Sequence, residues 1–588
     1  MMDPVTLAVV RGALEQIADE MDLRLIRAAV SPIISETNDC AHGLYDPVTG
    51  ETIAQGGYGL PQFLANMQWT VQRVIAVATA HGGGQGGFHE GDLWILNDPY
   101  LSGTHLNDVV LVSPVFIDGR LFALFANTGH WMDLGGSVPG GWAPSATEIH
   151  QEGMIIPPLK LYDRGVYNAS LVQLIKANVR LPAQVEGDLA AMTNVFGAGR
   201  RGLLALVAKY GEATLTGCIA EMMDRSEAQM RSLITDIPDG TYRVEDWFDN
   251  DGVDDVPLRV VLTLTVAGSD MHFDFTGTAS AARGPMNISD STTKSMCLVA
   301  LKHVFPEVPV NGGAFRPTRF TIPSRTILAA EYPSPVGGTT DVTQRVVDVV
   351  FAALAQAIPL LVPAAPFGTT GVATVSGRKA DGGFYVAVYP YPGGYGASHG
   401  SDGLVNGTPP GSMAKFMSVE MSEHRYPLRF DYYRIREGSG GAGTHRGGCG
   451  TAYSITALAP CVVSVLGDRV DHQPPGIEGG GPAAPNEVRF VTGGQVWTPP
   501  FRSKAEKVAL AVGDSLRVAS PGGGGYGNPL LRPVQAVEDD LNAGLIDRHE
   551  AEAAYGVVVA ATSPAGDRCH VTLDSAATAQ RRAAARTI

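Results

Sequence analysis

The sequence predicts a large multidomain protein of mixed α and β structure (α+β, or mixed α/β). From Leu7 to Leu25, apolar residues recur at three- and four-residue steps, which is the spacing of an amphipathic helix. The apolar runs at residues 109–112 and 121–126, and the alternating run at 262–266, are typical of strands. Glycine is dense in the last third of the chain, where tight turns between strands explain it best.

Composition excludes several classes of protein. The 588 residues suffice for about three or four domains of ordinary size. A content of 45% hydrophobic and 17% charged residues indicates a globular chain. The net charge of −16 argues against a nucleic-acid partner, because a phosphate backbone would be repelled. The six cysteines lie scattered without a CxxC pair, so neither a disulfide framework nor a zinc ribbon is indicated.

Residues 349–368 are uncharged and long enough to suggest a membrane span. However, Gln356 and three prolines interrupt them, which favours a buried helix followed by a loop. The N-terminus shows no positive region followed by an apolar core, which argues against secretion. We therefore expect a cytoplasmic protein without a membrane partner.

Three polar residues flank the pair of apolar runs. His105 and Asp108 precede the first run, and His130 follows the second. Between the runs, residues 117–120 supply the Asp-Gly of a hairpin turn, so an antiparallel hairpin would bring the three residues together. Imidazole and carboxylate ligands suit Zn²⁺, Mn²⁺ or Fe²⁺ with a position left open. The alternative for any one of them is a hydrogen-bonded structural role.

The same stretch carries three motifs: Asn-Asp-Pro-Tyr at 97–100, Gly-Thr-His-x-x-Asp at 103–108 and His-x-x-Asp-x-Gly-Gly at 130–136. In these motifs the chain resembles the hydantoinase B/oxoprolinase family, and the resemblance extends over nearly its whole length. It implies that His105, Asp108 and His130 bind a metal, with Asp39 as a fourth ligand. Many members carry a second His after the one matching His130, whereas Trp131 stands there in this sequence.

Several further residues are candidates for the site. Glu148 is a candidate general base or partner of an imidazole, and Asp133 is a second catalytic candidate. Each has an ordinary alternative: an exposed loop glutamate for Glu148, and a turn or cap role for Asp39. Trp131 would wall the substrate pocket or, alternatively, pack into the core.

Two arginines could bind an anionic group. Arg316 and Arg345 could each hold a carboxylate or phosphate by bidentate hydrogen bonds, with structural ion pairing as the commoner alternative. The glycine-dense run at 438–448 lacks the Gly-Lys-Ser/Thr of a P-loop, and that motif is absent from the whole sequence. We therefore expect no nucleotide site in this chain.

The predicted organisation has four parts. Residues 1–236 form a metal-binding catalytic domain, and the texture changes at Ile237-Pro238-Asp239-Gly240. Residues 237–370 form a middle α/β domain, and 371–530 a glycine-rich, β-rich domain. Residues 531–588 form a helical tail, in which Asp547 and Glu550 make a capping-box pattern and Gly556 is a stop signal.

The resemblance implies the catalytic B subunit of an ATP-dependent hydrolase acting on a hydantoin, oxoproline or lactam. In that family an A-type subunit of actin-like ATPase fold handles ATP and Mg²⁺, which implies a phosphorylated intermediate and a hetero-oligomer with two copies of each subunit. One alternative is a subunit of an acetone- or acetophenone-type ketone carboxylase. Another is a non-catalytic scaffold for the A subunit, which would have no use for clustered metal ligands.

Overall fold

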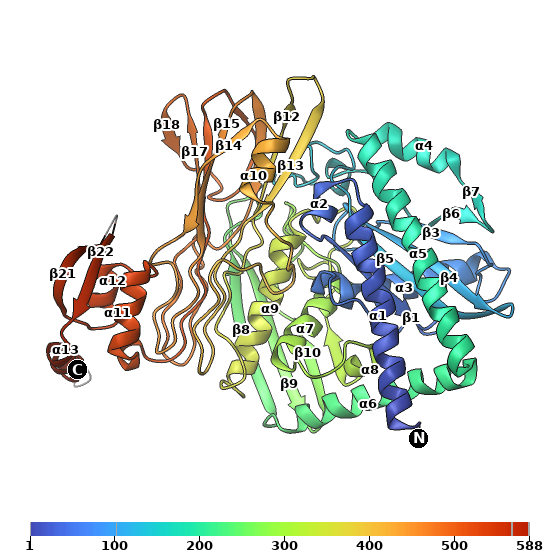
Figure 1. The fold of residues 1–588 in the computed structure, drawn as a ribbon, viewed down its shortest axis with the longest axis horizontal. Helices are drawn as coiled ribbons and strands as arrows, with labels where there is room; N and C mark the ends of the chain where they lie inside the picture. The colour runs from blue at the N-terminus through green and yellow to red at the C-terminus, as the bar shows by residue number, and fades with distance from the viewer. Residues whose placement is uncertain (1, 102, 566–567, 586–588) are drawn as a thin grey trace.

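Five β-sheets and the helices packed against them form the computed structural model, which describes residues 2–101, 103–565 and 568–585 (Figure 1). The elements of the first third of the chain lie at one end of the molecule and the C-terminal elements lie at the opposite end (Figure 1). The chain is therefore of mixed α and β structure with several sheets, as the sequence predicts.

A seven-stranded sheet is the framework of the N-terminal part. Its order is β2-β1-β5-β4-β3-β6-β7, and all neighbouring strands are antiparallel. The strands are β1 (Cys40–Tyr45), β2 (Thr52–Gln55), β3 (Leu93–Leu96), β4 (Asp108–Ile117), β5 (Arg120–His130), β6 (Leu159–Asp163) and β7 (Val166–Tyr167). The central strands are buried on both faces, because helices cover both sides of the sheet.

The β4–β5 hairpin confirms the predicted antiparallel pair. Asp118 and Gly119 form its turn with φ of 47° and 75°, the left-handed backbone that a tight hairpin of this hand requires. The register runs without a break at the far end, where Asp108 lies opposite His130. Side chains alternate between the two faces of the sheet, so Val109 and Val110 enter different cores.

Helices cover both faces of this sheet. Helix α1 (Pro4–Ala28) and helix α5 (Pro182–Tyr210) pack on one face, and α3 (Pro61–His81) packs on the other (Figure 1). Helix α1 is the predicted amphipathic helix; its N-cap Asp3 accepts a hydrogen bond from the backbone N–H of Thr6.

The region from 168 to 236 is helical, as expected, with α4 (Ala169–Asn178), α5 and α6 (Glu212–Thr235). Within α5, one carboxylate oxygen of Asp188 accepts the backbone N–H groups of Val30 and Ser31, which ties α5 to the segment after α1. Among the described residues no single helix has both the length and the apolar character to cross a membrane, although the pair α5 and α6, bent by 106°, passes that test together.

A second, four-stranded sheet has the order β11-β10-β9-β8. Its strands are β8 (Gly240–Phe248), β9 (Leu258–Ala267), β10 (Asp270–Asp274) and β11 (Thr318–Thr321), and the helices of this part are α7 (Asp290–Val304), α8 (Gly312–Phe315) and α9 (Thr339–Ala355). Helix α9 packs on β8, β9 and α7 and is buried along most of its length. The uncharged run that begins at Val349 is therefore the end of a buried helix, followed by a loop.

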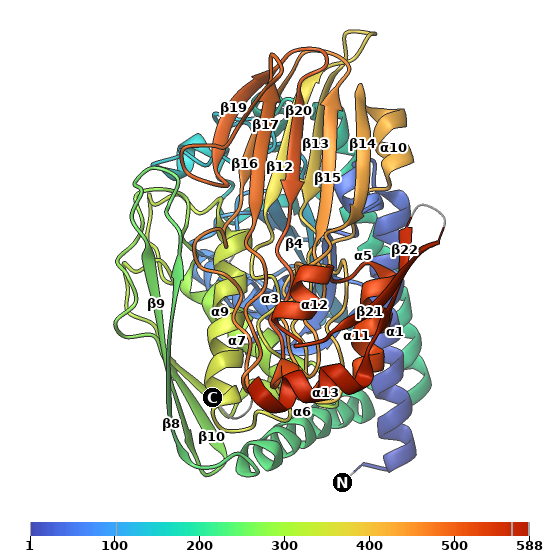
Figure 2. The ribbon, with the colours of Figure 1, turned by 90° about the vertical axis from the view of Figure 1, so that its left-hand side faces the viewer.

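Two sheets face each other in the later part and form a β-sandwich (Figure 2). One sheet, β13-β12-β16-β19, consists of β12 (Val372–Arg378), β13 (Phe384–Pro390), β16 (Cys461–Leu466) and β19 (Ala505–Leu510). The other, β14-β15-β20-β17-β18, consists of β14 (Leu428–Ile435), β15 (Thr451–Ala457), β17 (Glu487–Thr492), β18 (Gln495–Trp497) and β20 (Ser515–Ala519). Their facing side chains share one apolar core, and α10 (Val419–Arg425) flanks β14.

Extended glycine-rich segments continue from the sandwich and pack backbone against backbone. The N–H of Gly441 donates to the carbonyl of Gly523, and the N–H of Gly523 donates to that of Gly448. A Cβ on Gly447 would lie only 1.9 Å from the carbonyl oxygen of Gly523, so no larger residue fits. The glycine run at 438–448 therefore serves close packing of backbones and not the tight turns that the sequence suggests.

The C-terminal part differs from the purely helical tail that the sequence predicts. Helices α11 (Val534–Ala543), α12 (Arg548–Ala553) and α13 (Ser575–Ala585) are present, and Asp547 caps α12 by accepting the N–H of Glu550. Between α12 and α13, however, β21 (Val559–Ala565) and β22 (Arg568–Leu573) form an antiparallel hairpin. The hairpin packs on the helices through Val559, Val571 and Leu573, an alternation too short to stand out in the sequence.

Candidate metal centre

The hairpin ends place His105, Asp108 and His130 in one buried cluster. One candidate ligand atom from each residue lies within 4.8 Å of the other two, and the three residues are only 4%, 2% and 1% exposed. Nδ1 of His105 lies 2.6 Å from Oδ2 of Asp108, and Nε2 of His105 lies 3.2 Å from Nε2 of His130. The three residues that the sequence brings together by hairpin geometry are therefore neighbours in the structure.

The donor set fits a divalent metal ion. Two imidazole nitrogens 3.2 Å apart need a proton or a cation between them. Nitrogens bonded at about 2.0–2.1 Å to one tetrahedral ion would lie about 3.3 Å apart, close to the separation found here. Oδ1 of Asp108 and Nδ1 of His130 are buried without a hydrogen-bond partner among the described residues. Such orphaned atoms are costly unless something else binds them.

Asp39 lies beside this cluster, directly before β1. Its Oδ1 is buried without a hydrogen-bond partner in the described part of the chain, and its carbonyl accepts the backbone N–H of His130. Burial, and secondly repulsion by Asp108, raise the pKa of Asp39 well above its usual value. A cation would relieve that repulsion. Asp39 is outside the group of three mutually close ligand atoms, so a fourth-ligand role for it stays a prediction.

The electrostatics keep His130 suited to ligation. Burial, and secondly the neighbouring His105, lower the pKa of His130 well below its usual value, so the imidazole is neutral at pH 7. The ring of Trp142 stacks on that of His130, with centroids 5.1 Å apart and an angle of 11°. Trp142 also contacts His105, with centroids 5.5 Å apart. Neutral imidazole is the form that binds metals.

A small cavity of about 30 Å³ adjoins the cluster. Its lining comes from three regions of the chain: Asp39, Gln62, His105, His130 and Trp142 from the N-terminal part, Thr340 from α9, and Thr370, Val372, Val388, Pro390, Ser412 and Met417 from the later part. The cluster therefore lies at a junction, and elements remote in sequence complete its surroundings.

The predicted pocket-wall role of Trp131 is wrong, because its side chain enters the core below the sheet. Trp131 is fully buried and packs among apolar residues of α5, and its Nε1 lies 3.4 Å from Sδ of Met192. Successive residues at the end of β5 point to opposite sides, so His130 faces the cluster and Trp131 faces away. The tryptophan that lines the cavity is Trp142, in the loop after β5.

The structure also speaks against Asp133 as a catalytic group. Its Oδ1 accepts hydrogen bonds from Nη1 of Arg180 and the backbone N–H of Gly140, at 2.8 and 3.3 Å. Its Oδ2 accepts the backbone N–H groups of Arg180 and Gly135, at 2.7 and 3.2 Å. All four contacts are structural, and Asp133 does not line the cavity. Its carboxylate fixes the glycine turn that follows the metal motif.

Glu148, the other catalytic candidate, lies outside the site. It is exposed and forms a capping box with Gln151 at a short 3-10 helix, η1 (Ile149–Gln151). It does not line the cavity, so the ordinary alternative of an exposed loop glutamate describes it correctly. The nearby buried acid is Glu152, which accepts the backbone N–H groups of Val336 and Gly337 at 3.0 and 2.7 Å. Burial raises the pKa of Glu152 to about 8.

Both arginines considered for anion binding make ion pairs within the protein. Arg316 contacts Glu51 with two guanidinium nitrogens at 3.0 Å. Arg345 is fully buried and contacts Asp246 and Asp468 at 3.0 and 2.8 Å. The commoner, structural alternative therefore holds for both.

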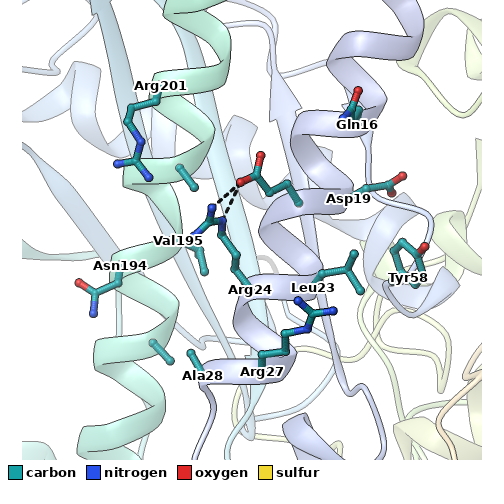
Figure 3. Close-up of a pocket in the computed structure, with 13 residues that line it drawn as sticks. Gln16, Asp19, Leu23, Arg24, Arg27, Ala28, Tyr58, Asn194, Val195 and Arg201 are labelled. Carbon is teal, nitrogen blue, oxygen red and sulfur yellow. Dashed lines mark hydrogen bonds and ion pairs between the residues drawn. The ribbon is translucent and has the colours of Figure 1, made fainter.

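A larger hollow, of about 790 Å³, lies between α1 and α5, away from the cluster (Figure 3). Arg24 and Arg27 of α1 and Arg201 of α5 line it (Figure 3), and Arg24 is paired with Glu20. None of the predicted site residues lines it. The larger hollow is therefore not the candidate metal site, since His105 and His130 of the cluster line the smaller cavity.

Comparisons with known proteins agree with the motifs. The family model described as hydantoinase B/oxoprolinase matches residues 3–529. The chain is 32% identical over 600 residues to caprolactamase subunit beta of Pseudomonas jessenii, which covers 99% of each sequence.

Two solved structures share the fold. The crystal structure of ATP-dependent caprolactamase from Pseudomonas jessenii superposes with a TM-score of 0.88 and 30% identity, over 99% of this chain and 100% of that one. Acetone carboxylase in a nucleotide-free state gives a TM-score of 0.89 at 20% identity, over 100% of this chain and 83% of that one. The second likeness concerns the fold alone. The chain belongs to the hydantoinase B/oxoprolinase family.

Proposed function

We propose that the chain is the metal-binding catalytic subunit of an ATP-dependent hydrolase that opens cyclic amides. The buried cluster of His105, Asp108 and His130 beside a small cavity carries this proposal. Membership of the hydantoinase B/oxoprolinase family supports the reaction class. The similarity to a caprolactamase subunit favours a lactam or a related ring as the substrate.

His105, Asp108 and His130 would hold one divalent ion, Zn²⁺ or Mn²⁺ and less readily Fe²⁺, with Asp39 as a further ligand. When bound, such an ion supplies a Lewis acid and lowers the pKa of a coordinated water. The cluster has two imidazoles and two carboxylates for this purpose, and a small cavity adjoins it.

Neighbouring side chains orient the two imidazoles and shield them from solvent. Oδ2 of Asp108 lies 2.6 Å from Nδ1 of His105 and helps to hold that imidazole beside His130, with the two Nε2 atoms 3.2 Å apart. Trp142 lies over both imidazoles and keeps water from their faces. The apolar lining, which includes Val372, excludes solvent and would contact the hydrocarbon part of a ring.

The ATP-dependent step belongs to a second subunit in this proposal. The sequence has no Gly-Lys-Ser/Thr motif, and the similar caprolactamase chain is a beta subunit, so a partner subunit is implied. We infer an A-type, ATP- and Mg²⁺-binding partner, two copies of each subunit, and a phosphorylated amide that passes from the partner to this chain.

Turnover by the two co-purified subunits tests the proposal. Caprolactam, hydantoin and 5-oxoproline are offered with ATP in bicarbonate-free buffer, and both ADP and the ring-opened acid are measured. Ring opening should occur for one of them, should vanish in His105→Ala, and should persist in His150→Ala, which changes an exposed histidine outside the cluster. Turnover of a ketone that demands bicarbonate and places labelled carbon in the product would instead identify a carboxylase.

A further inference from the structure

Two unpaired hydroxyl groups line the same cavity as the metal cluster. Thr340 lies in the first turn of α9 and Thr370 lies two residues before β12; the two residues are 8% and 4% exposed. Both line the cavity together with His105 and His130. The Oγ1 atoms of both threonines lack a hydrogen-bond partner among the described residues. A buried hydroxyl without a partner costs about 1–3 kcal/mol, so the pair is expensive unless a ligand binds it.

Neighbouring contacts fix the two threonines beside the metal loop. Thr339 donates its hydroxyl to the carbonyl of Thr104, which precedes His105, at 2.8 Å. Thr369, next to Thr370, donates its hydroxyl to the carboxylate of Asp341. These two contacts join α9 to the metal loop and to the start of β12, so the free hydroxyls are held on a rigid frame.

The start of α9 adds a third donor group. Helix α9 is 17 residues long, and its N-cap, Gly338, offers no side chain to the first turn. Within the described residues, the backbone N–H of Thr340 has no hydrogen-bond acceptor, whereas those of Thr339 and Asp341 bond to the carbonyls of Val336 and Gly338. The N-terminus of a long helix carries partial positive charge and favours anionic oxygens.

We propose that Thr340, Thr370 and the N-terminus of α9 form a subsite that binds the anionic oxygens of the substrate. This inference rests on the proposed function, which places a substrate in this cavity. The groups that converge here are hydrogen-bond donors at the positive end of a helix, and a phosphoryl group or a carboxylate supplies the matching acceptors. Part of the remaining wall, with Val372, Val388 and Met417, is apolar and suits a methylene chain or ring.

The small size of the cavity implies that its wall moves when a ligand binds. A cavity of about 30 Å³ is far smaller than the roughly 300–1,000 Å³ of ordinary ligand pockets, so a whole substrate enters only when the wall widens. Ser412, Ala414 and Met417 in that wall belong to the irregular segment between β13 and α10. Thr340 lies in α9 and Thr370 in the segment before β12, so both hydroxyls are outside that irregular segment.

Binding to the metal-loaded chain tests the subsite without any turnover. Isothermal titration is performed with inorganic phosphate, with acetate and with neutral 2-pyrrolidinone, on wild type, Thr340→Val, Thr370→Val and Thr340→Ser. Thr374→Val is the matched control, because Thr374 is a buried threonine of β12 that does not line the cavity. Metal content is measured in each sample, so that affinities are compared at equal occupancy.

Each valine variant should weaken phosphate or acetate binding about tenfold, which corresponds to about 1.4 kcal/mol. Thr340→Ser and Thr374→Val should bind as wild type, and 2-pyrrolidinone should be unaffected. Thermal stability of the unliganded valine variants should be equal to or above that of wild type, because an unpaired hydroxyl is removed. Loss of phosphate binding assigns the subsite to a phosphoryl group, and loss of acetate binding assigns it to a carboxylate.

Equal anion affinity in wild type and both valine variants would overturn the inference, as would weakened binding of the neutral lactam only. Absence of any anion binding by wild type would overturn it as well. Because no step requires ATP or ring opening, these outcomes are separate from failure of the proposed hydrolase, which is judged by turnover alone.

Discussion

Replacing Asp133 with Asn distinguishes a structural from a catalytic role for this residue. The carboxylate accepts four hydrogen bonds, two on each oxygen, from Arg180 and from the N–H groups of Gly135, Gly140 and Arg180 itself. An amide can accept on one oxygen only, so its NH₂ group must face two donors whichever way it turns. Asp133→Asn therefore leaves two donors without an acceptor and breaks the ion pair.

The hydrogen bonds that Asp133→Asn removes determine the expected loss of stability. Hydrogen bonds to a charged group contribute about 1.5–3 kcal/mol each, which gives about 3–6 kcal/mol for the two that are lost. The side chain of Arg180 is 30% exposed, and solvent screens part of its attraction to Asp133. We therefore expect the lower end, about 3 kcal/mol, for the local stability of the 133–140 turn. Since 1.4 kcal/mol is a factor of ten, backbone amides there should exchange about a hundredfold faster.

Hydrogen exchange measured by mass spectrometry on peptides covering residues 133–140 provides the assay. Arg180→Met serves as the partner variant, and the double variant should lose less than the sum of the two single changes, because both remove the same contact. Turnover per correctly folded, metal-loaded molecule should remain near that of wild type. Unchanged exchange together with a loss of turnover of more than a hundredfold would refute the structural role and restore Asp133 as a catalytic residue.

Four further substitutions test other parts of the structure. Glu148→Ala should leave turnover unchanged and lower stability by about 1 kcal/mol or less through the lost cap, as measured by thermal unfolding; a large fall in kcat would contradict its surface position. Trp131→Ala should cost about 3–5 kcal/mol of stability as a core truncation. By contrast, Trp142→Phe should mainly change KM. If Trp131→Ala changed KM and Trp142→Phe mainly lowered stability, Trp131 would be the residue at the pocket and Trp142 the core residue. Because burial raises the pKa of Glu152 to about 8, the folded state binds a proton that the unfolded state releases near pH 4.5. Stability should therefore fall between about pH 5 and 8, and Glu152→Gln should flatten that fall; equal pH profiles of the melting temperature would argue against the raised pKa.

The parts of the site that could be predicted from sequence are those fixed by local rules. The Asp-Gly turn and the two apolar runs determine a hairpin, and a hairpin places its two ends side by side, so His105, Asp108 and His130 could be grouped from the sequence alone. The family motifs point to the same residues. The amphipathic spacing in α1 and the uncharged run at the end of α9 are likewise local patterns with few alternative structures.

The surroundings of the site depend on contacts that no local pattern reports. Trp142 reaches the imidazoles from an irregular loop, while Trp131 lies next to His130 in sequence but on the opposite side of the strand. The partner of Asp133 is 47 residues away, in the segment before α5. Thr340 and Thr370 meet the cluster only because α9 and β12 pack against the metal loop. The strand pair β21–β22 is not predictable from its sequence, because it is short and only weakly alternating.

The metal content of the purified chain tests the central claim most directly. Mass spectrometry of the elements in the co-purified subunits should find one equivalent of a divalent transition metal or zinc per copy of this chain. His130→Ala should lose that metal while keeping its folded hydrogen-exchange profile, and His150→Ala, with an exposed histidine changed, should keep it. A wild-type chain active without any such metal, or a His130→Ala variant with full metal content, would contradict the account.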